Sequence, residues 1–540
     1  MQPPGEKEAQ LTGPGTLPPS ALDRDPAPPP SWAIAPVDGR VLDPSTALVV
    51  KGVRPRSTVY VGPRLTISRT LDFAEVLDIL RTVAEKLGWD VDPEEDDPRL
   101  SGLRLGVRRV SLSVGSRKAT LAPDGWTLLQ QARAMFGIER LRGVGLDHVV
   151  FARPVGANPY DLSHPYDLSH PYDLSHPYDL SHPGHGAGPS AAVATYGVPG
   201  SGGRQPVAYV GPRPHRRSEA ELPGRRPVVA ILDTGCGPHA WLDGVVDCSV
   251  TLDGVPIGHT SPSTDPELHG DLTGPLDGSI DPLSGHGTFI AGLVHQGCPD
   301  ADILSWRVVP SEGPIVESDW VTALTQIAEL VRRHWAGEPG GRRIDVLSLS
   351  MGYYHETPAD ALFDETLHAI LSDLGRHGVT VVCSAGNDAT SRPSFPAALG
   401  PWQDGGGPVP TSSDCVPIVS VGALNPNCRT DALFSNAGPW VRCHVPGAAV
   451  VSTMPAFEGG NLPGARMRAF GRTRETIDPD DFRGGFAVWS GTSFAAPLMA
   501  GVLAQGLLEK LGEQSVAGET VDSAVRRAWD VVESVTPIRS

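Results

Sequence analysis

The sequence contains no long hydrophobic run. No stretch of about 18 apolar residues occurs anywhere in the chain, so no membrane-spanning helix is expected. The first thirty residues lack a basic start followed by an apolar stretch, and no signal peptide is predicted. These two absences predict a cytoplasmic protein without a membrane partner, although export by another route stays open.

Lysine and cysteine are also scarce. Only five of the 44 basic residues are Lys, and the 62 acidic residues give a formal net charge of −18. Nucleic acids and anionic lipids select clustered Lys and Arg, so an acidic surface argues against both as partners. The seven Cys residues are odd in number and form no C-x-x-C pair, which predicts reduced, buried thiols and fits a cytoplasmic setting.

Glycine (62 residues) and proline (54) are plentiful and unevenly spread over the 540 residues, which predicts ordered domains joined by flexible segments. Residues 1–45 are rich in Pro and are predicted to be disordered. Residues 46–155 have the pattern of a small α+β domain. Residues 156–224 carry four tandem copies of PYDLSH between Pro159 and His182. A Pro in every copy prevents a helix, so this range is predicted to be a flexible linker.

In residues 225–535, apolar strand-like runs alternate with helical patterns. The predicted strands are residues 228–232, 303–308, 344–350, 379–383 and 416–421. This alternation predicts an α/β fold, in which a doubly wound, mostly parallel sheet has helices on both faces, next to a smaller N-terminal α+β domain. In such sheets, chemistry takes place at the carboxyl ends of the strands.

Four polar residues stand where such a sheet places its chemistry. Asp233 ends the first predicted strand, in VVAILDTG, and Asn387 follows a later strand, in VVCSAGN. His286, in SGHGTFIAGLV, and Ser493, in WSGTSFAAPLMAG, each stand at the start of an apolar helix. The positive end of a helix dipole favours negative charge that develops on a serine oxygen. Singly, each residue is explained equally well as a turn residue or helix cap, but together they predict an active site.

In the order Asp, His, Asn, Ser, these motifs resemble those of the subtilisin-like serine proteases (subtilases), over about residues 225–535. Subtilisin is itself the standard example of the chain order Asp, His, Ser. The resemblance implies a serine endopeptidase, a hydrolase that carries out proteolysis with a catalytic triad. In that reading Ser493 is the nucleophile, His286 the base, Asp233 the residue that orients His286, and Asn387 a donor of the oxyanion hole.

Further segments match the family in the same order, among them SLSMG (348–352), FPAA (395–398), VSVGA (419–423), FSNAG (434–438) and VPG (445–447). The resemblance implies that two segments contact a protein or peptide substrate: Ser350, Met351 and Gly352, and Ser384, Ala385 and Gly386. The chain departs from the family pattern at residues 455–486, which are predicted to be an insertion near the cleft.

No cofactor is required by this chemistry, and no metal site is assigned. Calcium is common in the family and is possible here, because an acidic loop precedes His286. Its members are Asp265, Glu267, Asp271, Asp277 and Asp281. Their spacing fits no calcium loop that can be specified, so a solvated acidic face is the favoured interpretation.

Several alternatives stay open. The N-terminal domain is either an intramolecular pro-domain or a retained recognition domain that targets the protease. The same scaffold could also serve a peptide ligase or macrocyclase, in which an amine replaces water at the acyl-enzyme and the insertion at 455–486 excludes water. A non-catalytic binding protein is the third possibility, and the four intact site positions argue against it.

Overall fold

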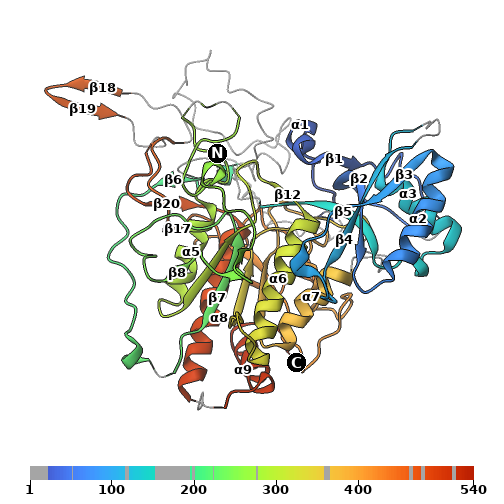
Figure 1. Ribbon diagram of the computed structural model, residues 1–540. Coiled ribbons are helices and arrows are strands. Elements are labelled where there is room, and N and C mark those ends of the chain that lie inside the picture. The colour runs from blue at the N-terminus through green and yellow to red at the C-terminus, as the bar shows by residue number, and fades with distance from the viewer. Residues whose placement is uncertain are drawn as a thin grey trace, which may run out of the picture.

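The computed structural model describes residues 22–539, apart from 51–52, 116–120, 153–194, 198–200, 223, 275, 277, 358–364, 461–465, 476–480 and 514–517. Figure 1 shows a larger body, coloured green to red, and a smaller N-terminal unit in blue beside it.

A seven-stranded sheet forms the centre of the larger body, and every pair of neighbouring strands in it is parallel. In spatial order the strands are β16 (Cys443–Pro446), β15 (Val419–Leu424), β14 (Thr380–Ser384), β13 (Val346–Leu349), β7 (Val228–Asp233), β11 (Asp302–Arg307) and β8 (Val246–Asp247). The predicted parallel sheet is therefore confirmed, and five of its strands are those expected from the apolar runs.

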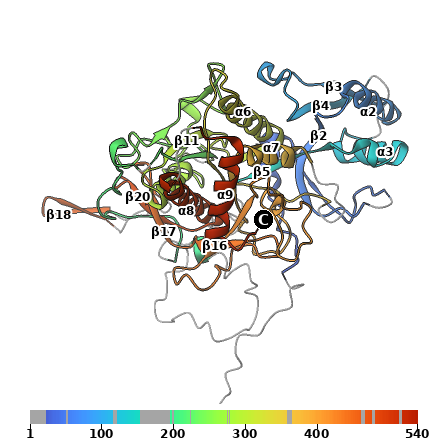
Figure 2. The same cartoon turned by 90° about the horizontal axis from the view of Figure 1, so that it is seen from below.

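Helices cover both faces of this sheet (Figure 2). Helices α5 (His286–Gly297) and α8 (Thr492–Glu513) lie on one face with α9 (Val521–Val535) against α8, and α6 (Glu317–Ala336) and α7 (Glu365–Arg376) lie on the other. Strand β7 illustrates why both faces need cover: successive side chains of a strand point to opposite faces of the sheet, and here both sets are apolar. Val229 and Ile231 join the core with α5 and α8, whereas Ala230 and Leu232 join the core with α6 and α7.

Helix α8 runs through the middle of the larger body. Within the described part of the chain it is the one helix that is long and apolar enough to cross a membrane, over Thr492–Gly512. In the fold, however, 67% of its most apolar window is buried. Phe494 and Leu503, both 0% exposed, belong to the core beneath the sheet. Its apolar character is thus explained by packing inside the protein.

The N-terminal unit is an antiparallel sheet with helices on one face, as predicted for this part of the chain. Its elements are α1 (Ser31–Ile34), β1 (Gly39–Leu42), β2 (Thr58–Ser68), α2 (Phe73–Leu87), β3 (Trp89–Pro93), β4 (Val107–Val114), α3 (Gly125–Phe136) and β5 (Val144–Phe151). Helices α2 and α3 share a core with this sheet, while β4 and β5 contact α6 of the larger body. The sheet also continues into the larger body, because β12 (Pro314–Val316) pairs antiparallel with β5.

Three small sheets complete the structure. One joins β17 (Val450–Thr453), β20 (Phe486–Trp489) and β6 (Gln205–Pro206), and a second joins β9 (Thr251–Leu252) to β10 (Val255–Pro256). The third is the hairpin of β18 (Arg466–Ala469) and β19 (Arg472–Glu475). It lies in the predicted insertion 455–486 and projects away from the body (Figure 1).

The prediction of disorder for residues 1–45 is wrong for residues 22–45, while residues 1–21 lie outside the described residues. The Thr390 hydroxyl donates to the carbonyls of Leu22 (3.0 Å) and Arg24 (2.6 Å), and Arg392 pairs with Asp25 at 2.9 Å. Composition predicts disorder because it counts few local apolar contacts. Residues 22–25 are ordered instead by polar partners 366–368 positions later in the chain, and the rest of the segment by the pairing of β1 with β2 and the buried side chains of Ile34 and Leu42.

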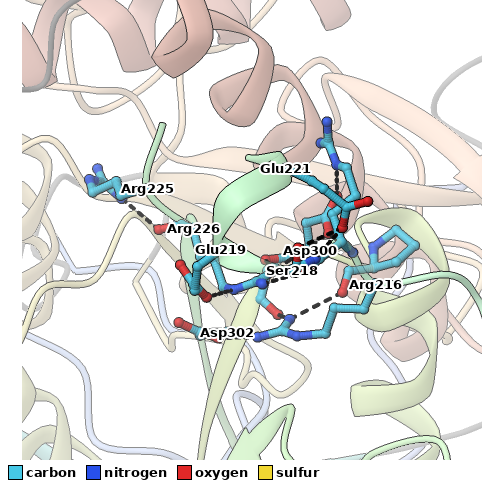
Figure 3. A network of polar contacts seen from close by, with 11 residues as sticks. Arg216, Ser218, Glu219, Glu221, Arg225, Arg226, Asp300 and Asp302 are labelled. Carbon is cyan, nitrogen blue, oxygen red and sulfur yellow. Dashed lines mark hydrogen bonds and ion pairs between the residues drawn. The ribbon is translucent and has the colours of Figure 1, made fainter. Parts of the chain in front are cut away.

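The predicted flexible linker 156–224 is likewise wrong for residues 201–222; the PYDLSH repeats lie outside the described residues. Arg204 is buried and donates to the carbonyls of Ile280 (2.7 Å), Asp281 (2.8 Å) and Ser284 (3.1 Å). Further along, a network of charged residues fixes the segment before β7 to the larger body (Figure 3). The network includes an ion pair between Arg217 Nε and Asp300 Oδ2, which are 2.8 Å apart. The arginines of this segment anchor it to the fold.

Candidate active site

Asp233 and His286 form a buried pair. Asp233 is the last residue of β7 and His286 the first of α5, and both are 0% exposed. His286 Nδ1 lies 2.5 Å from Asp233 Oδ1, which also accepts hydrogen bonds from the Thr234 N–H (2.8 Å) and hydroxyl (3.1 Å). The carboxylate therefore accepts a hydrogen bond from Nδ1–H, which keeps the proton on Nδ1 and leaves Nε2 as the proton-accepting nitrogen.

The two elements approach each other closely because a glycine follows His286. A Cβ atom on Gly287 would lie 2.0 Å from the carbonyl oxygen of Gly235. Any larger residue at this position would push the start of α5 away from the turn that follows Asp233. Gly285, with φ of 82°, supplies the left-handed backbone conformation that leads into the helix.

Ser493 lies in the first turn of α8, directly after Thr492. Its hydroxyl donates to the Ser350 carbonyl at 3.3 Å, and the Ser350 hydroxyl donates to the Ser493 carbonyl at 2.9 Å. The His286 ring packs against Phe494, the next residue, with ring centroids 5.3 Å apart. The His286 ring thus lies against the residue that follows Ser493, while the serine hydroxyl is turned toward Ser350. His286 Nε2 is buried and has no hydrogen-bond partner within the described residues.

Asn387 follows β14 and is oriented by the start of α8. The Thr492 N–H and hydroxyl both donate to Asn387 Oδ1, at 2.9 and 2.8 Å. Because two donors fix the oxygen, the amide NH₂ group is directed away from Thr492. Asn387 and Ser493 line the same cleft. Gly386, which carries φ of 101°, lets the chain turn before Asn387.

The cleft contains most of the predicted substrate-contact segments. Its lining includes Ser350, Met351, Gly352, Ser384 and Gly386. Ala385 is the exception. It is 0% exposed, its N–H donates to the Val421 carbonyl at 2.9 Å, and its carbonyl accepts from Asn436 at 2.8 Å. Both backbone groups of Ala385 are thus used inside the protein, and only its neighbours face the cleft.

The N-terminal unit forms the opposite wall of this cleft. Residues Pro26 to Pro29 line it, together with parts of β2 and β5. At the end of β5, the Phe151 N–H donates to the Gly352 carbonyl and the Gly352 N–H donates to the Phe151 carbonyl, both at 3.1 Å. Phe151 therefore pairs as an antiparallel strand with the segment that the sequence predicts to pair with substrate backbone.

Glu267 is a residue of this site that the sequence did not single out, because it was predicted to belong to a solvated acidic loop. It is 1% exposed and accepts hydrogen bonds from the Gly287 N–H (2.9 Å), the Thr288 N–H (3.3 Å) and the hydroxyls of Thr234 and Thr288. Burial raises its pKa to about 7. A carboxylate 19 positions before the site histidine carries no local sequence signal.

The other described carboxylates of the acidic loop bind protein donors of their own. Asp265 pairs with Arg307 at 3.2 Å, Asp271 accepts from the Gly278 N–H at 2.7 Å, and Asp281 accepts from the Leu272 N–H at 2.7 Å. Asp277 lies outside the described residues. Within the described chain these carboxylates do not gather around one point, so the arrangement does not favour a calcium site and calcium stays a prediction.

One cluster of potential metal ligands does occur, at the contact between the N-terminal unit and the larger body. His148, His355 and Glu356 are buried, with ligand atoms within 4.8 Å of one another. His148 Nδ1 lies 2.5 Å from Glu317 and its Nε2 lies 2.8 Å from Glu356. Burial lowers the pKa of His148, but the two carboxylates outweigh it and raise that pKa to about 10. A protonated His148 between two carboxylates explains this cluster without a metal.

Comparisons with known proteins identify the family of this chain. Residues 224–529 match the model of the subtilase family. The chain is 25% identical over 261 residues to the major intracellular serine protease of Bacillus subtilis (strain 168), covering 46% of this chain and 66% of that protein, slightly less than two thirds of its length. It is 25% identical over 307 residues to an intracellular serine protease of Paenibacillus polymyxa, covering 54% of this chain and 69% of that protein.

Among solved structures, a cold-adapted subtilisin-like serine proteinase aligns with 19% identity and a TM-score of 0.34, over 56% of this chain and 81% of that chain. The family match spans more than half of the chain and includes all four predicted site residues. This chain is therefore a member of the subtilase family.

Proposed function

We propose that the protein is a serine endopeptidase that hydrolyses peptide bonds through an acyl-enzyme. The observation that carries the proposal is the buried 2.5 Å contact between His286 Nδ1 and Asp233 Oδ1, with Phe494, the residue after Ser493, packed against the His286 ring. A hydroxyl is inert at neutral pH unless a base takes its proton, and an imidazole held by a carboxylate is such a base.

The proposed reaction starts with the Ser493 hydroxyl. It gives its proton to His286 Nε2 as its oxygen bonds to the carbonyl carbon of the substrate. The C–N bond then breaks, the proton passes from His286 to the leaving amine, and an ester on Ser493 is left. Water then gives a proton to His286 and attacks the ester. The acid product leaves, and His286 returns the proton to the Ser493 oxygen. Asp233 stabilises the imidazolium in both halves without taking the proton itself.

In this proposal two donors stabilise the oxyanion. Asn387 presents its NH₂ group because Thr492 holds its Oδ1, and the Ser493 N–H belongs to the free donors of the first helical turn. These donors act on charge that exists only in the transition state, so they raise turnover rather than substrate affinity.

The Ser350 carbonyl links substrate binding to the readiness of the nucleophile. In the structure it accepts the Ser493 hydroxyl at 3.3 Å. A substrate backbone N–H that pairs with this carbonyl displaces the hydroxyl, which then turns to His286 Nε2. The serine is therefore aligned for attack only when peptide backbone occupies the segment from Ser350 to Gly352.

The N-terminal unit is proposed to act as an intramolecular pro-domain. Its Phe151 already holds both backbone groups of Gly352, and residues Pro26 to Pro29 line the cleft. A peptide that needs Gly352 has to displace the end of β5. A retained recognition domain would leave this groove accessible, so the contact favours the pro-domain over the recognition domain.

The test uses a fluorophosphonate probe and intact mass. The wild-type chain should be labelled at Ser493, and Ser493→Ala should not be labelled; labelling of that variant at the same rate would refute the assignment. If the N-terminal unit is a pro-domain, purified wild type should be processed and Ser493→Ala should remain full length. Two full-length proteins would speak against self-processing.

Two of the relatives are named intracellular proteases, and we propose the same location here. Fractionation of the producing cells would check this location. An antibody to the larger body should detect the protein in the cytoplasmic fraction.

A further inference from the structure

Glu267 contacts the residues that directly follow Asp233 and His286, and the proposed reaction does not involve it. It is almost completely buried (1% exposed), and its two oxygens receive four donors. Two are the N–H groups of Gly287 and Thr288, the residues that follow His286 in α5. The other two are hydroxyls, one from Thr288 and one from Thr234, which follows Asp233. One carboxylate therefore connects the element that carries the base with the element that orients it.

The Thr234 hydroxyl lies between the Glu267 and Asp233 carboxylates and can donate a hydrogen bond to either one. Its oxygen already accepts the Gly287 N–H at 2.7 Å. Its one proton faces two acceptors, Asp233 Oδ1 at 3.1 Å and the closer Glu267 Oε1. A hydroxyl has a single proton to donate, so the two carboxylates compete for it.

The outcome of this competition depends on whether Glu267 carries a proton. An ionised Glu267 accepts the hydrogen bond of the Thr234 hydroxyl. Asp233 then keeps only the Thr234 N–H and His286 as donors. A protonated Glu267 donates to the Thr234 oxygen instead, and the Thr234 proton then turns to Asp233. An extra hydrogen bond to Asp233 weakens its support for the imidazolium, and the negative charge of Glu267 is lost at the same time.

We propose that Glu267 is a positioning residue of the proteolytic site, which holds α5 against the turn after Asp233 and, through the Thr234 hydroxyl, keeps Asp233 available to His286. The proposal rests on the proposed function. The raised pKa of Glu267, about 7 because of burial, is consistent with a proton that can be gained or lost near neutrality.

The surroundings of Glu267 contain few other charges. Besides Asp233 and His286, the titratable and charged groups near it include, among the described residues, the thiols of Cys236 and Cys248, the ion pair of Asp265 with Arg307, and His269 of the same loop. Burial and the contact with Cys248 keep the pKa of Cys236 well above its usual value. Of these groups, Glu267 is the one that a shared hydroxyl, that of Thr234, connects to Asp233.

The test follows the rate at which the fluorophosphonate probe labels the purified protein between about pH 5 and pH 9, with wild type and variants compared in the same processed form by intact mass. Glu267→Gln should lower the plateau rate about 10-fold and move the acid limb of the profile to lower pH by about half a unit or more. It should also make that limb less steep, because one ionisation is removed. The matched control is Glu458→Gln, because the Glu458 side chain is 79% exposed and takes no part in the proposed reaction. Its profile should coincide with wild type.

A merely structural role predicts a different result. In that case Glu267→Gln loses activity in parallel with thermal stability and leaves the acid limb unmoved, which overturns the proposal. We expect its melting temperature at pH 8 to fall somewhat, because the amide group cannot accept all four donors, but the acid limb should move whatever the size of that fall.

A second pair of variants keeps the proposal testable if Glu267→Gln does not fold. Thr234→Val should reproduce the shift of the acid limb, and Thr234→Ser, which keeps the hydroxyl, should restore the wild-type profile. Equal profiles for the Val and Ser variants would overturn the proposal. Failure of the proposed function is recognised separately, because wild type itself would then not be labelled at Ser493.

Discussion

The contact between the N-terminal unit and the larger body should weaken as the pH rises. Two neighbouring residues of β5 carry the effect. Asp147 accepts hydrogen bonds from the Ser318 N–H (2.9 Å) and hydroxyl (2.8 Å) at the start of α6. His148 lies between Glu317 and Glu356. Burial raises the pKa of Asp147 to about 7, and for His148 the two carboxylates outweigh burial and raise the pKa to about 10.

Both shifts act in the same direction. A group whose pKa is higher in the docked state binds its proton more tightly there, so docking is favoured at low pH and loses free energy as the pH rises. The contribution of Asp147 is complete below its ordinary value of 3.8 and is lost through about pH 7. That of His148 is complete below 6.5 and is lost through about pH 10.

The magnitude follows from the linkage between protonation and docking. One pKa unit corresponds to about 1.4 kcal/mol. A rise from about pH 6 to about pH 8 then removes roughly 1 kcal/mol of docking free energy through Asp147 and roughly 2 kcal/mol through His148. The two side chains are 0% and 1% exposed, so water screens little of this effect. Together they change the docking equilibrium about 100-fold.

Hydrogen exchange at Phe151 and Gly352 measures this docking, because their amides bond across the contact. The Ser493→Ala variant provides a background without self-cleavage. Protection factors, corrected for intrinsic exchange, should fall about 100-fold from about pH 6 to about pH 8. His148→Gln should flatten most of this change, whereas His215→Gln, at an exposed position, should not. Protection that is constant over this range, or that rises, would refute the reasoning.

Two further predictions concern catalysis and stability. Asn387→Ala should lower kcat by roughly 10²–10³ with little change in KM, a figure measured for the equivalent donor in subtilisin itself, and steady-state kinetics on a peptide would show it; an equal loss in KM would instead indicate a role in binding. Arg204→Ala should destabilise the protein by roughly 1–3 kcal/mol, because it removes the guanidinium donor from the carbonyls of Ile280 and Ser284 and one of two donors from that of Asp281. Chemical unfolding, with exposed Arg429→Ala as the control, would measure it, and equal stabilities of the two variants would contradict this account.

The sequence predicted those parts of the site that depend on local pattern. Asp233 ends an apolar strand and His286 and Ser493 begin apolar helices, and the parallel sheet then brings strand ends and helix starts together. Features that depend on distant partners could not be predicted. Glu267 is buried where α5 and Thr234 offer it donors, and residues 22–25 are ordered through contacts with Thr390 and Arg392. Nor does any local signal indicate that the Ser493 hydroxyl points to Ser350.

The pairing of β12 with β5 has a consequence for how the protein is made. Strand β5 ends at Phe151, and its partner begins at Pro314, roughly 160 residues later. At a synthesis rate of about 5–20 residues per second, the nascent N-terminal unit waits roughly 10–30 s with that edge unpaired. An open strand edge is a template for pairing with other chains. Ribosomes translating one message in close succession would therefore present several such edges at once, and early binding by a chaperone would protect the newborn protein during this interval.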